Sequence, residues 1–226
     1  MRLRVKFEKC GSVRFASHRD VVRIIQRVVA AAEMPVSYTQ GYHPHMRMSF
    51  GPPLKTGWEG FDEYLDIHVD KTVTQVEDRC NPIMPNGLRF VACSEVLEGV
   101  PKLANDISAA NYEIRVRKQE VGIGRELSTE RFEQTTREIE SRFAGEDGHR
   151  PRVTAVSAHL EGDDVLIGYT STMHGGKVVQ PQELLDEFGF AADLPTPARV
   201  ARKAQFVARN GNYFSPLNEA ILQGTI

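Results

Sequence analysis

Residues 38–57 form a long segment that is rich in glycine and proline and combines ring and cationic side chains. Aromatic side chains between cations suit single-stranded RNA, because bases stack on the rings while the cations hold phosphates. Long connections are uncommon in compact domains, and those that occur often carry a function. The alternative is a proline-braced structural loop whose tyrosines pack on a sheet. The candidate RNA-contacting residues are Tyr38, Gln40, Gly41, Tyr42, His45 and Arg47.

Three arginines, Arg19, Arg23 and Arg27, recur every fourth residue just before this segment. That spacing places them on one face of a helix, opposite much of its apolar stripe. Guanidinium groups bind phosphates through paired hydrogen bonds, so the row is a candidate phosphate-binding surface, with Arg14 as a further cation. A solvated helix face is the other interpretation of the same row.

His18 and His45 are the candidate catalytic residues. The helix dipole at the N-terminus favours neutral imidazole at His18, which is the form that a general base needs. A structural histidine packed under the helix is the alternative. His18, His43 and His45 have no Asp, Glu or Cys at ligand spacing, so we expect no metal site. The sequence contains no Walker loop, no G-x-S-x-G and no H-E-x-x-H.

The first 97 residues must position these side chains, and their patterns predict the order β-α-β-β-α-β. Residues 2–8 alternate as a half-buried strand, and Val13–Ala16 is expected to be extended. Ser17 and Asp20 form a capping-box variant that begins a helix, which ends before Pro35. We expect the other elements at 35–39 and 46–50 (extended), 61–69 (strand), 74–84 (helix) and 88–97 (strand).

The same order recurs in the second half, with strands at 109–118, 153–160, 165–172 and 200–208 and helices at 128–143 and 181–188. The sequence therefore predicts an α+β protein of two tandem ferredoxin-like (βαββαβ) modules with antiparallel sheets. We expect the first module at 1–97, a linker at 98–108 and the second module at 109–226.

Composition excludes several classes of protein. The chain of 226 residues is 41% hydrophobic and 26% charged, which fits a folded globular protein. Residues 1–47 contain nine Lys/Arg and three acids, whereas the rest contain 19 and 27, so one face is expected to be basic.

The scattered Cys10, Cys80 and Cys93 favour reduced thiols and exclude an iron–sulfur cluster built by this chain alone. No apolar run reaches the roughly 20 residues of a membrane helix, and the start does not resemble a signal peptide. We expect a cytoplasmic protein.

Four motifs resemble those of the radical-SAM-linked DUF2344 family. They are Phe15-Ala16-Ser17-His18-Arg19-Asp20 ("F-x-S-H-x-D"), Tyr38 to Ser49 ("S-Q-G-F-N-P-H-P-K-I-S"), Leu54-Lys55-Thr56-Gly57 ("P-L-x-x-G") and Glu63-Tyr64-Leu65-Asp66 ("E-Y-x-D"). The order and spacing match. The departures are Thr39 for Ser, Tyr42 for Phe, His43 for Asn, Met46 for Pro and Arg47 for Lys.

The resemblance implies that this protein works together with a radical SAM enzyme. The iron–sulfur cluster and SAM are then expected on that partner, and no cofactor is expected on this chain. It also implies RNA modification or ribosome maturation. We therefore expect a non-catalytic RNA-binding accessory protein whose RNA is tRNA or rRNA, with no DNA or membrane partner. The loop also distantly resembles CRISPR RNA-processing endonucleases, which leaves a metal-independent endoribonuclease as one alternative. A pure protein–protein adaptor for the radical SAM enzyme is the other.

Overall fold

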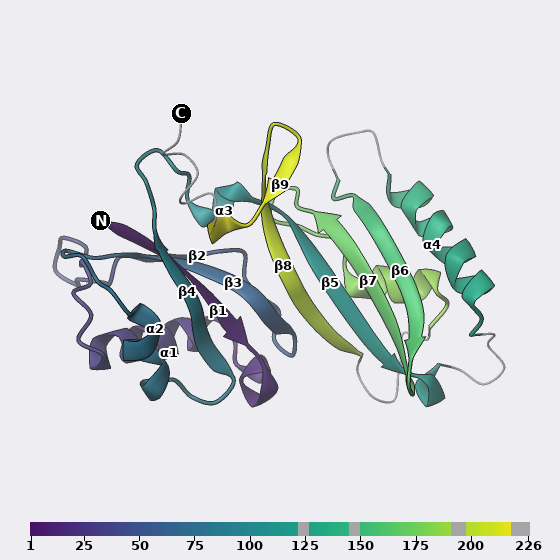
Figure 1. Cartoon of the computed structure of the whole chain (residues 1–226), viewed down its shortest axis with the longest axis horizontal. Helices are drawn as coiled ribbons and strands as arrows, with labels where there is room; N and C mark the ends of the chain where they lie inside the picture. Colours follow the sequence, from purple (N-terminus) through teal and green to yellow (C-terminus); the bar gives the residue numbers. More distant parts are fainter. Residues whose placement is uncertain (122–126, 145–149, 191–197, 218–226) are drawn as a thin grey trace. The chain divides into compact units, whose positions relative to one another are not determined.

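The structure is a computed structural model that describes residues 1–121, 127–144, 150–190 and 198–217 (Figure 1). Its contacts divide the chain into two compact units. The first comprises Met1–Ile107 and Ala204–Ile226, and the second comprises Ser108–Lys203. The sequence analysis assigned residues 109–226 to the second module, whereas the structure groups the described residues 204–217 with the first unit.

The sheet of the first unit has the strand order β4-β1-β3-β2, and each neighbouring pair is antiparallel (Figure 1). Its strands are β1 (Arg2–Lys9), β2 (Met48–Phe50), β3 (Glu59–His68) and β4 (Leu88–Glu95). The chain enters these strands in the predicted order, with the first helix between β1 and β2. β1 is therefore a central strand with partners on both sides.

Alternation along β1 divides the sheet into two faces. Leu3, Val5 and Phe7 are buried on one face, where they join the core that contains Ile25 and Val29 of the first helix. The prediction that the opposite face of β1 is open to solvent is wrong for Arg4, which is fully buried. Its guanidinium is covered because it binds a carboxylate and two main-chain carbonyls within the same unit.

Helix α1 (His18–Ala31) begins and ends where the sequence predicts. The Ser17 hydroxyl accepts a hydrogen bond from the Asp20 backbone N–H, and the Asp20 carboxylate accepts one from the Ser17 backbone N–H. The hydrogen bond from the Ser17 hydroxyl also lowers the pKa of Asp20. This capping box satisfies backbone N–H donors that the first helical turn leaves without partners, so the start of α1 is fixed.

Three local predictions for the first unit are wrong. Residues 11–15 form a 3-10 helix rather than an extended piece, because the chain turns from β1 into α1 within a few residues. Residues 35–39 make only isolated bridges, Val36 to Val69 and Tyr38 to Met46. The predicted helix over 74–84 is shorter, comprising α2 (Val76–Cys80) and a 3-10 turn at Asn81–Ile83.

The predicted linker at 98–108 includes a short helix, α3 (Leu103–Asp106), and the first residues of β5 (Ile107–Arg117). Later in the chain, β8 (Arg199–Arg209) crosses the boundary between the units and pairs with β9 (Asn212–Phe214), a strand that the sequence analysis did not predict. Its short connection, with Asn210 and Gly211 at positive φ, is the signal that was missed.

The second unit pairs β5 with β7 (Asp164–Thr172), and β7 with β6 (Val153–Glu161), both antiparallel. Directly opposed residues on one face are buried, such as Tyr112 against Tyr169 and Ile114 against Ile167. Helix α4 (Thr129–Phe143), which Ser128 caps, and α5 (Pro181–Glu187) contribute Phe132, Ile139 and Leu184 to the buried set.

The α+β class with antiparallel pairing is therefore confirmed. Within the described part of the chain, no helix is long and apolar enough to cross a membrane.

Candidate nucleic-acid interface

The loop between α1 and β2 is closed by its own hydrogen bonds. The Arg47 backbone N–H donates to Ser37 O at 2.8 Å, and the Thr39 backbone N–H donates to His45 O at the same distance. The Thr39 hydroxyl in turn accepts from the backbone N–H of His45 at 3.0 Å. These bonds join the two arms of the loop, so residues 40–44 form a defined tip.

The tip projects into solvent. Tyr42 has an exposed fraction of 103%, and Tyr38 on the adjoining arm is 50% exposed. The alternative in which both tyrosines pack on the sheet is therefore wrong for Tyr42. Gly41 adopts a φ of +129°, a conformation that strongly favours glycine, so the turn at the tip depends on this residue. Gln40, His45 and Arg47 are also exposed.

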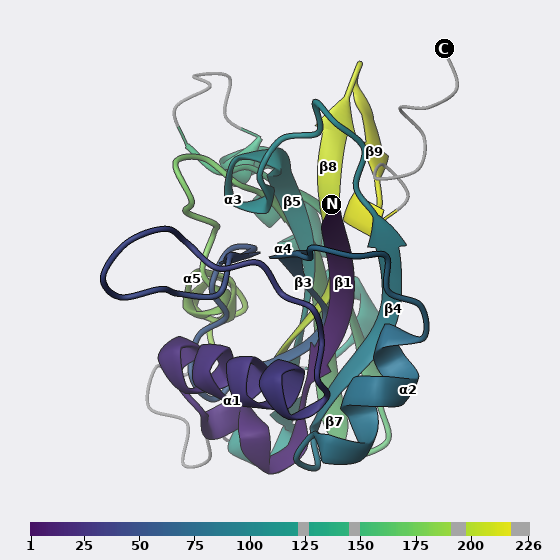
Figure 2. The same cartoon turned by 90° about the vertical axis from the view of Figure 1, so that its left-hand side faces the viewer.

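The arginine row of α1 is exposed as its spacing predicts. Arg19, Arg23 and Arg27 lie away from the buried face of the helix. Arg23 makes a surface ion pair with Asp20 at 3.7 Å, and within the described residues Arg19 and Arg27 make none. Figure 2 shows the loop arching out beside α1 on the same unit, so the cationic row and the exposed tyrosines belong to neighbouring surface elements.

Arg14 differs from the other cations because the fold already engages it. Its guanidinium lies 3.6 Å from the Glu59 carboxylate and 4.7 Å from the ring centre of Phe15. It is half-buried in the 3-10 helix that precedes α1. Arg14 is therefore held in place and less available to phosphate than the α1 arginines.

His18 is half-buried and lies edge-on to the Phe50 ring, with ring centres 5.5 Å apart. It lines a cavity of about 20 Å³ together with Lys9 and Glu63, which are 2% and 5% exposed. A cavity of that size holds about one water molecule. The sequence analysis did not single out Lys9 or associate Glu63 with His18, because only the register of β1 on β3 brings the two strands to this helix end.

The remaining histidine candidates lie elsewhere. His43 and His45 are exposed in the loop, and the His45 backbone bonds to Thr39 through both its N–H and its carbonyl. Among the residues that the structure describes, no group of three or more His, Cys, Asp or Glu side chains could hold a metal ion.

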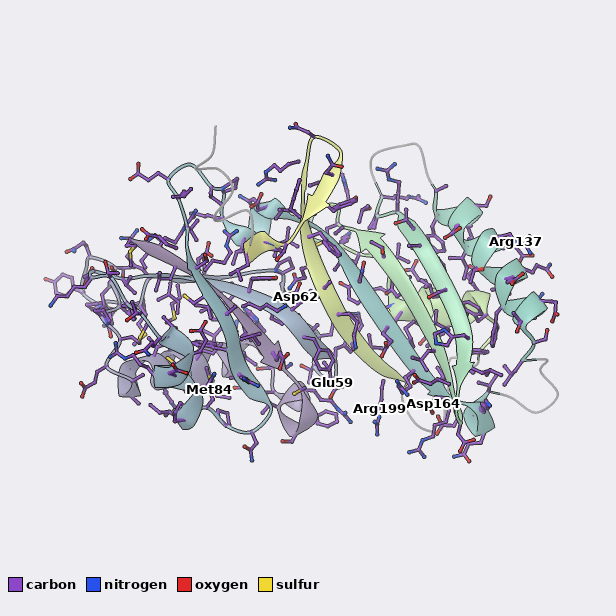
Figure 3. All side chains as sticks on the ribbon, in the orientation of Figure 1. Glu59, Asp62, Met84, Arg137, Asp164 and Arg199 are labelled. Carbon is purple, nitrogen blue, oxygen red and sulfur yellow. The ribbon has the colours of Figure 1, made fainter. Side chains whose placement is uncertain are left out.

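A second polar cluster, which the sequence did not predict, lies on the face of β3 opposite to Glu63. The Asp62 carboxylate accepts hydrogen bonds from the Tyr64 hydroxyl at 2.7 Å and from the Gln205 backbone N–H at 2.6 Å. It also lies 2.7 Å from the Lys6 ammonium. Figure 3 labels Asp62 on β3. Burial and the Asp62 charge raise the pKa of Tyr64, so this phenol stays protonated and acts as a donor.

All three cysteines are free thiols, as expected. Burial raises the pKa of Cys80 to about 11 and that of Cys93 to about 12, and it raises the pKa of Cys10 as well. Thiols of raised pKa are mostly protonated at neutral pH and are poor nucleophiles. The geometry therefore gives the cysteines no role in the candidate interface.

The chain belongs to the DUF2344 family. The family described as "Uncharacterized protein conserved in bacteria (DUF2344)" matches residues 2–155, which include all four motifs, the arginine row and the loop. No curated protein matches the chain.

Two solved structures show weak similarity to this chain. One is described as a putative glycine cleavage system transcriptional repressor, with 10% identity over 95% of this chain and 97% of that chain and a TM-score of 0.25. The other is an unknown protein from Galdieria sulphuraria, with 9% identity over 83% and 89% of the two chains and a TM-score of 0.23. Neither similarity bears on the function of this chain.

Proposed function

We propose that this protein is a non-catalytic RNA-binding accessory protein that works beside a radical SAM enzyme on tRNA or rRNA. The observation that carries the proposal is the fully exposed Tyr42 at the tip of a hydrogen-bonded loop next to the cationic row of α1. A large exposed ring costs solubility and contributes nothing to the core, so a stacking role accounts for its position.

Each group has a part in this proposal. Arg19, Arg23 and Arg27 hold phosphates along α1, and Arg47 extends the positive surface into the loop. The rings of Tyr38 and Tyr42 stack on unpaired bases, each stack being worth roughly 1–3 kcal/mol. Gln40 and His45 position the bases by hydrogen bonding, and Gly41 lets the RNA strand approach the protein backbone.

The radical SAM partner, with its cluster and SAM, is implied by the family resemblance. The cysteines are compatible with it, because Cys10, Cys80 and Cys93 are separate free thiols rather than a cluster-binding set. The cytoplasm, where thiols stay reduced, is the compartment we propose.

We further propose that both units are ferredoxin-like modules. The strand order β4-β1-β3-β2 of the first unit supports this, because its two helices connect alternate strands of an antiparallel sheet. In the second unit the pairing β5-β7-β6, with α4 between β5 and β6, repeats that arrangement.

The salt dependence of RNA binding tests the main proposal. We expect the purified protein to bind total cellular RNA in a fluorescence anisotropy titration, with affinity falling steeply as salt rises. Each phosphate contact contributes roughly −0.7 to the slope of log affinity against log salt for single strands, so four arginines predict a slope near −3. Absence of binding at low salt contradicts the proposal and favours the pure protein–protein adaptor.

A metal-independent endoribonuclease is the second candidate, because His18 shares its cavity with Lys9 and Glu63. An imidazole, an ammonium and a carboxylate around one water-sized space are a possible acid–base set. If this activity exists, RNA is cleaved in the presence of a metal chelator, and His18→Ala abolishes cleavage while RNA binding persists. His43→Ala, an exposed loop histidine outside the cavity, is the matched control. Intact RNA after incubation with wild-type protein excludes the activity.

A further inference from the structure

The second unit contains a cationic groove that the RNA proposal does not use. The groove has a volume of about 660 Å³, within the range of small-molecule sites. It lies where the end of α4, the start of β6 and the segment before α5 converge. Its principal lining residues are Arg142, Phe143, Arg150, Arg152, Lys177 and Gln180.

The charge of the groove opposes that of its surroundings. Residues 108–203 contain 13 Lys/Arg and 16 Asp/Glu, so the unit as a whole is acidic. Four of those cations nevertheless line this one groove, with Glu183 as the acidic lining residue. A concentration of positive charge in a hollow of an otherwise acidic unit attracts anions to that place.

Most of this charge is not neutralised by the fold. Arg142 forms an ion pair with Glu187. Within the part of the chain that the structure describes, Arg150, Arg152 and Lys177 make no ion pair. The Glu183 carboxylate accepts a hydrogen bond at 2.7 Å from the Gln180 backbone N–H, which engages it in capping α5. The groove therefore has three positive charges available to a ligand.

Hydrogen bonds hold two sides of the groove in place. On one side, the Val179 carbonyl accepts from the Tyr169 hydroxyl at 3.1 Å, and the Val179 backbone N–H donates to the Ser171 hydroxyl at 3.0 Å. Reciprocal backbone bonds of 2.9 Å between His174 and Lys177 close the preceding turn.

On the other side, the Arg152 backbone N–H donates to the Thr172 hydroxyl at 2.8 Å, and Arg152 O accepts from the Thr172 backbone N–H at 2.9 Å. The backbones that carry Lys177 and Arg152 are thus both fixed to β7. A preformed backbone lowers the entropic cost of ligand binding.

We propose that this groove binds a phosphorylated nucleoside, either as a free nucleotide or as the 5′-phosphorylated end of an RNA strand. Guanidinium groups bind phosphate oxygens in a bidentate manner, which suits Arg150 and Arg152, and Lys177 adds a point charge. The half-buried Phe143 supplies a ring for the base, and the groove is larger than a phosphate alone requires. This site is separate from the α1 and loop surface and does not depend on it.

Isothermal titration calorimetry of the full chain with 5′-AMP tests the proposal, with adenosine and inorganic phosphate as comparison ligands. We expect 5′-AMP to bind with micromolar to millimolar affinity and at least tenfold more tightly than either comparison ligand. A short single-stranded RNA with and without a 5′-phosphate distinguishes the two sources. Tighter binding of the 5′-phosphorylated strand than of the same strand without the phosphate identifies an RNA end. Equal binding of the two strands, with 5′-AMP bound in the groove, identifies a free nucleotide.

The double variant Arg152→Glu/Lys177→Glu should weaken 5′-AMP binding at least tenfold, and Lys177→Ala alone should weaken it less. Arg137→Glu is the matched control, because Arg137 is an exposed α4 arginine outside the groove (Figure 3). Binding that is equal in the double variant and the wild type overturns the proposal, as does phosphate binding as tight as that of 5′-AMP. Loss of binding in the control also overturns it, whereas variants of the α1 arginines should leave this binding unchanged.

Discussion

Replacing Arg4 with Met should lower the free energy of unfolding by about 3–5 kcal/mol, the cost of removing one partner from a buried ion pair. For a chain of this size, that loss lowers Tm by roughly 6–20 °C at 2–4 °C per kcal/mol. Thermal melts followed by circular dichroism or calorimetry measure the change. The variant should retain RNA affinity at temperatures where it is folded.

The reason is the completeness with which the fold pairs this guanidinium. Arg4 and Asp66 are directly opposite on β1 and β3, and both side chains are fully buried. Arg4 donates to both Asp66 carboxylate oxygens, at 2.8 and 3.1 Å. It also donates to Pro216 O at 3.1 Å and Pro101 O at 3.3 Å. Methionine fills similar space but removes the Arg4 donors from both carbonyls, and it leaves the Asp66 carboxylate with the Arg2 guanidinium at 3.9 Å.

A double-mutant cycle separates the ion pair from simple loss of packing. Asp66→Leu alone should also destabilise strongly, because it leaves the Arg4 charge buried. The double variant Arg4→Met/Asp66→Leu should lose less than the sum of the two single losses, since neither charge remains. Arg23→Met, at an exposed position, is the control and should change stability by no more than about 0.5 kcal/mol. Additive losses in the cycle would show that the two residues do not act as a pair.

Local chemistry made parts of the first unit predictable. The Ser17 and Asp20 capping box and the apolar stripe identify α1, and the exposure of Arg19, Arg23 and Arg27 follows from their spacing. The burial of Arg4 was not predictable in this way. A strand with alternating Arg and apolar residues is typical of a half-exposed sheet. The carbonyls of Pro101 and Pro216, which accept hydrogen bonds from the Arg4 guanidinium, come from distant parts of the chain.

Among the candidate sites, too, some follow from local sequence and others depend on distant parts of the chain. The exposed loop follows from its local composition, because tyrosines and cations around Gly41 have no apolar pattern that would bury them. The cavity of His18, Lys9 and Glu63 depends on strand register, which a single sequence does not specify. The groove of Arg142, Arg152 and Lys177 depends on three elements that are distant along the chain.

These two kinds of site make different demands on the fold. The loop and the α1 row need only a rigid support, which the capping box and the closed arms of the loop provide. The small cavity needs three elements held in register, so its chemistry should fail wherever the sheet is disturbed. Substitutions in the loop should therefore test the proposed RNA binding without the stability loss that core substitutions cause.

The triple variant Arg19→Glu/Arg23→Glu/Arg27→Glu should weaken RNA binding at least ~100-fold, since each charged hydrogen bond lost is worth ~1.5–3 kcal/mol. The slope of log affinity against log salt should become shallower by roughly 2, at about 0.7 for each of three phosphate contacts. Because all three side chains are exposed, the melt should stay within a few degrees of wild type. Fluorescence anisotropy at several salt concentrations measures both quantities.

Two comparisons make this result specific to the proposed surface. Arg131→Glu/Arg137→Glu, on the exposed side of α4, should leave RNA affinity nearly unchanged, because these residues lie outside the surface. Tyr42→Ala should weaken binding about 5- to 150-fold without altering the salt slope, since it removes a stacking ring rather than a charge, and Tyr42→Phe should restore it. Equal losses in the α4 and α1 variants would indicate binding by overall charge, which contradicts a defined interface on α1 and the loop.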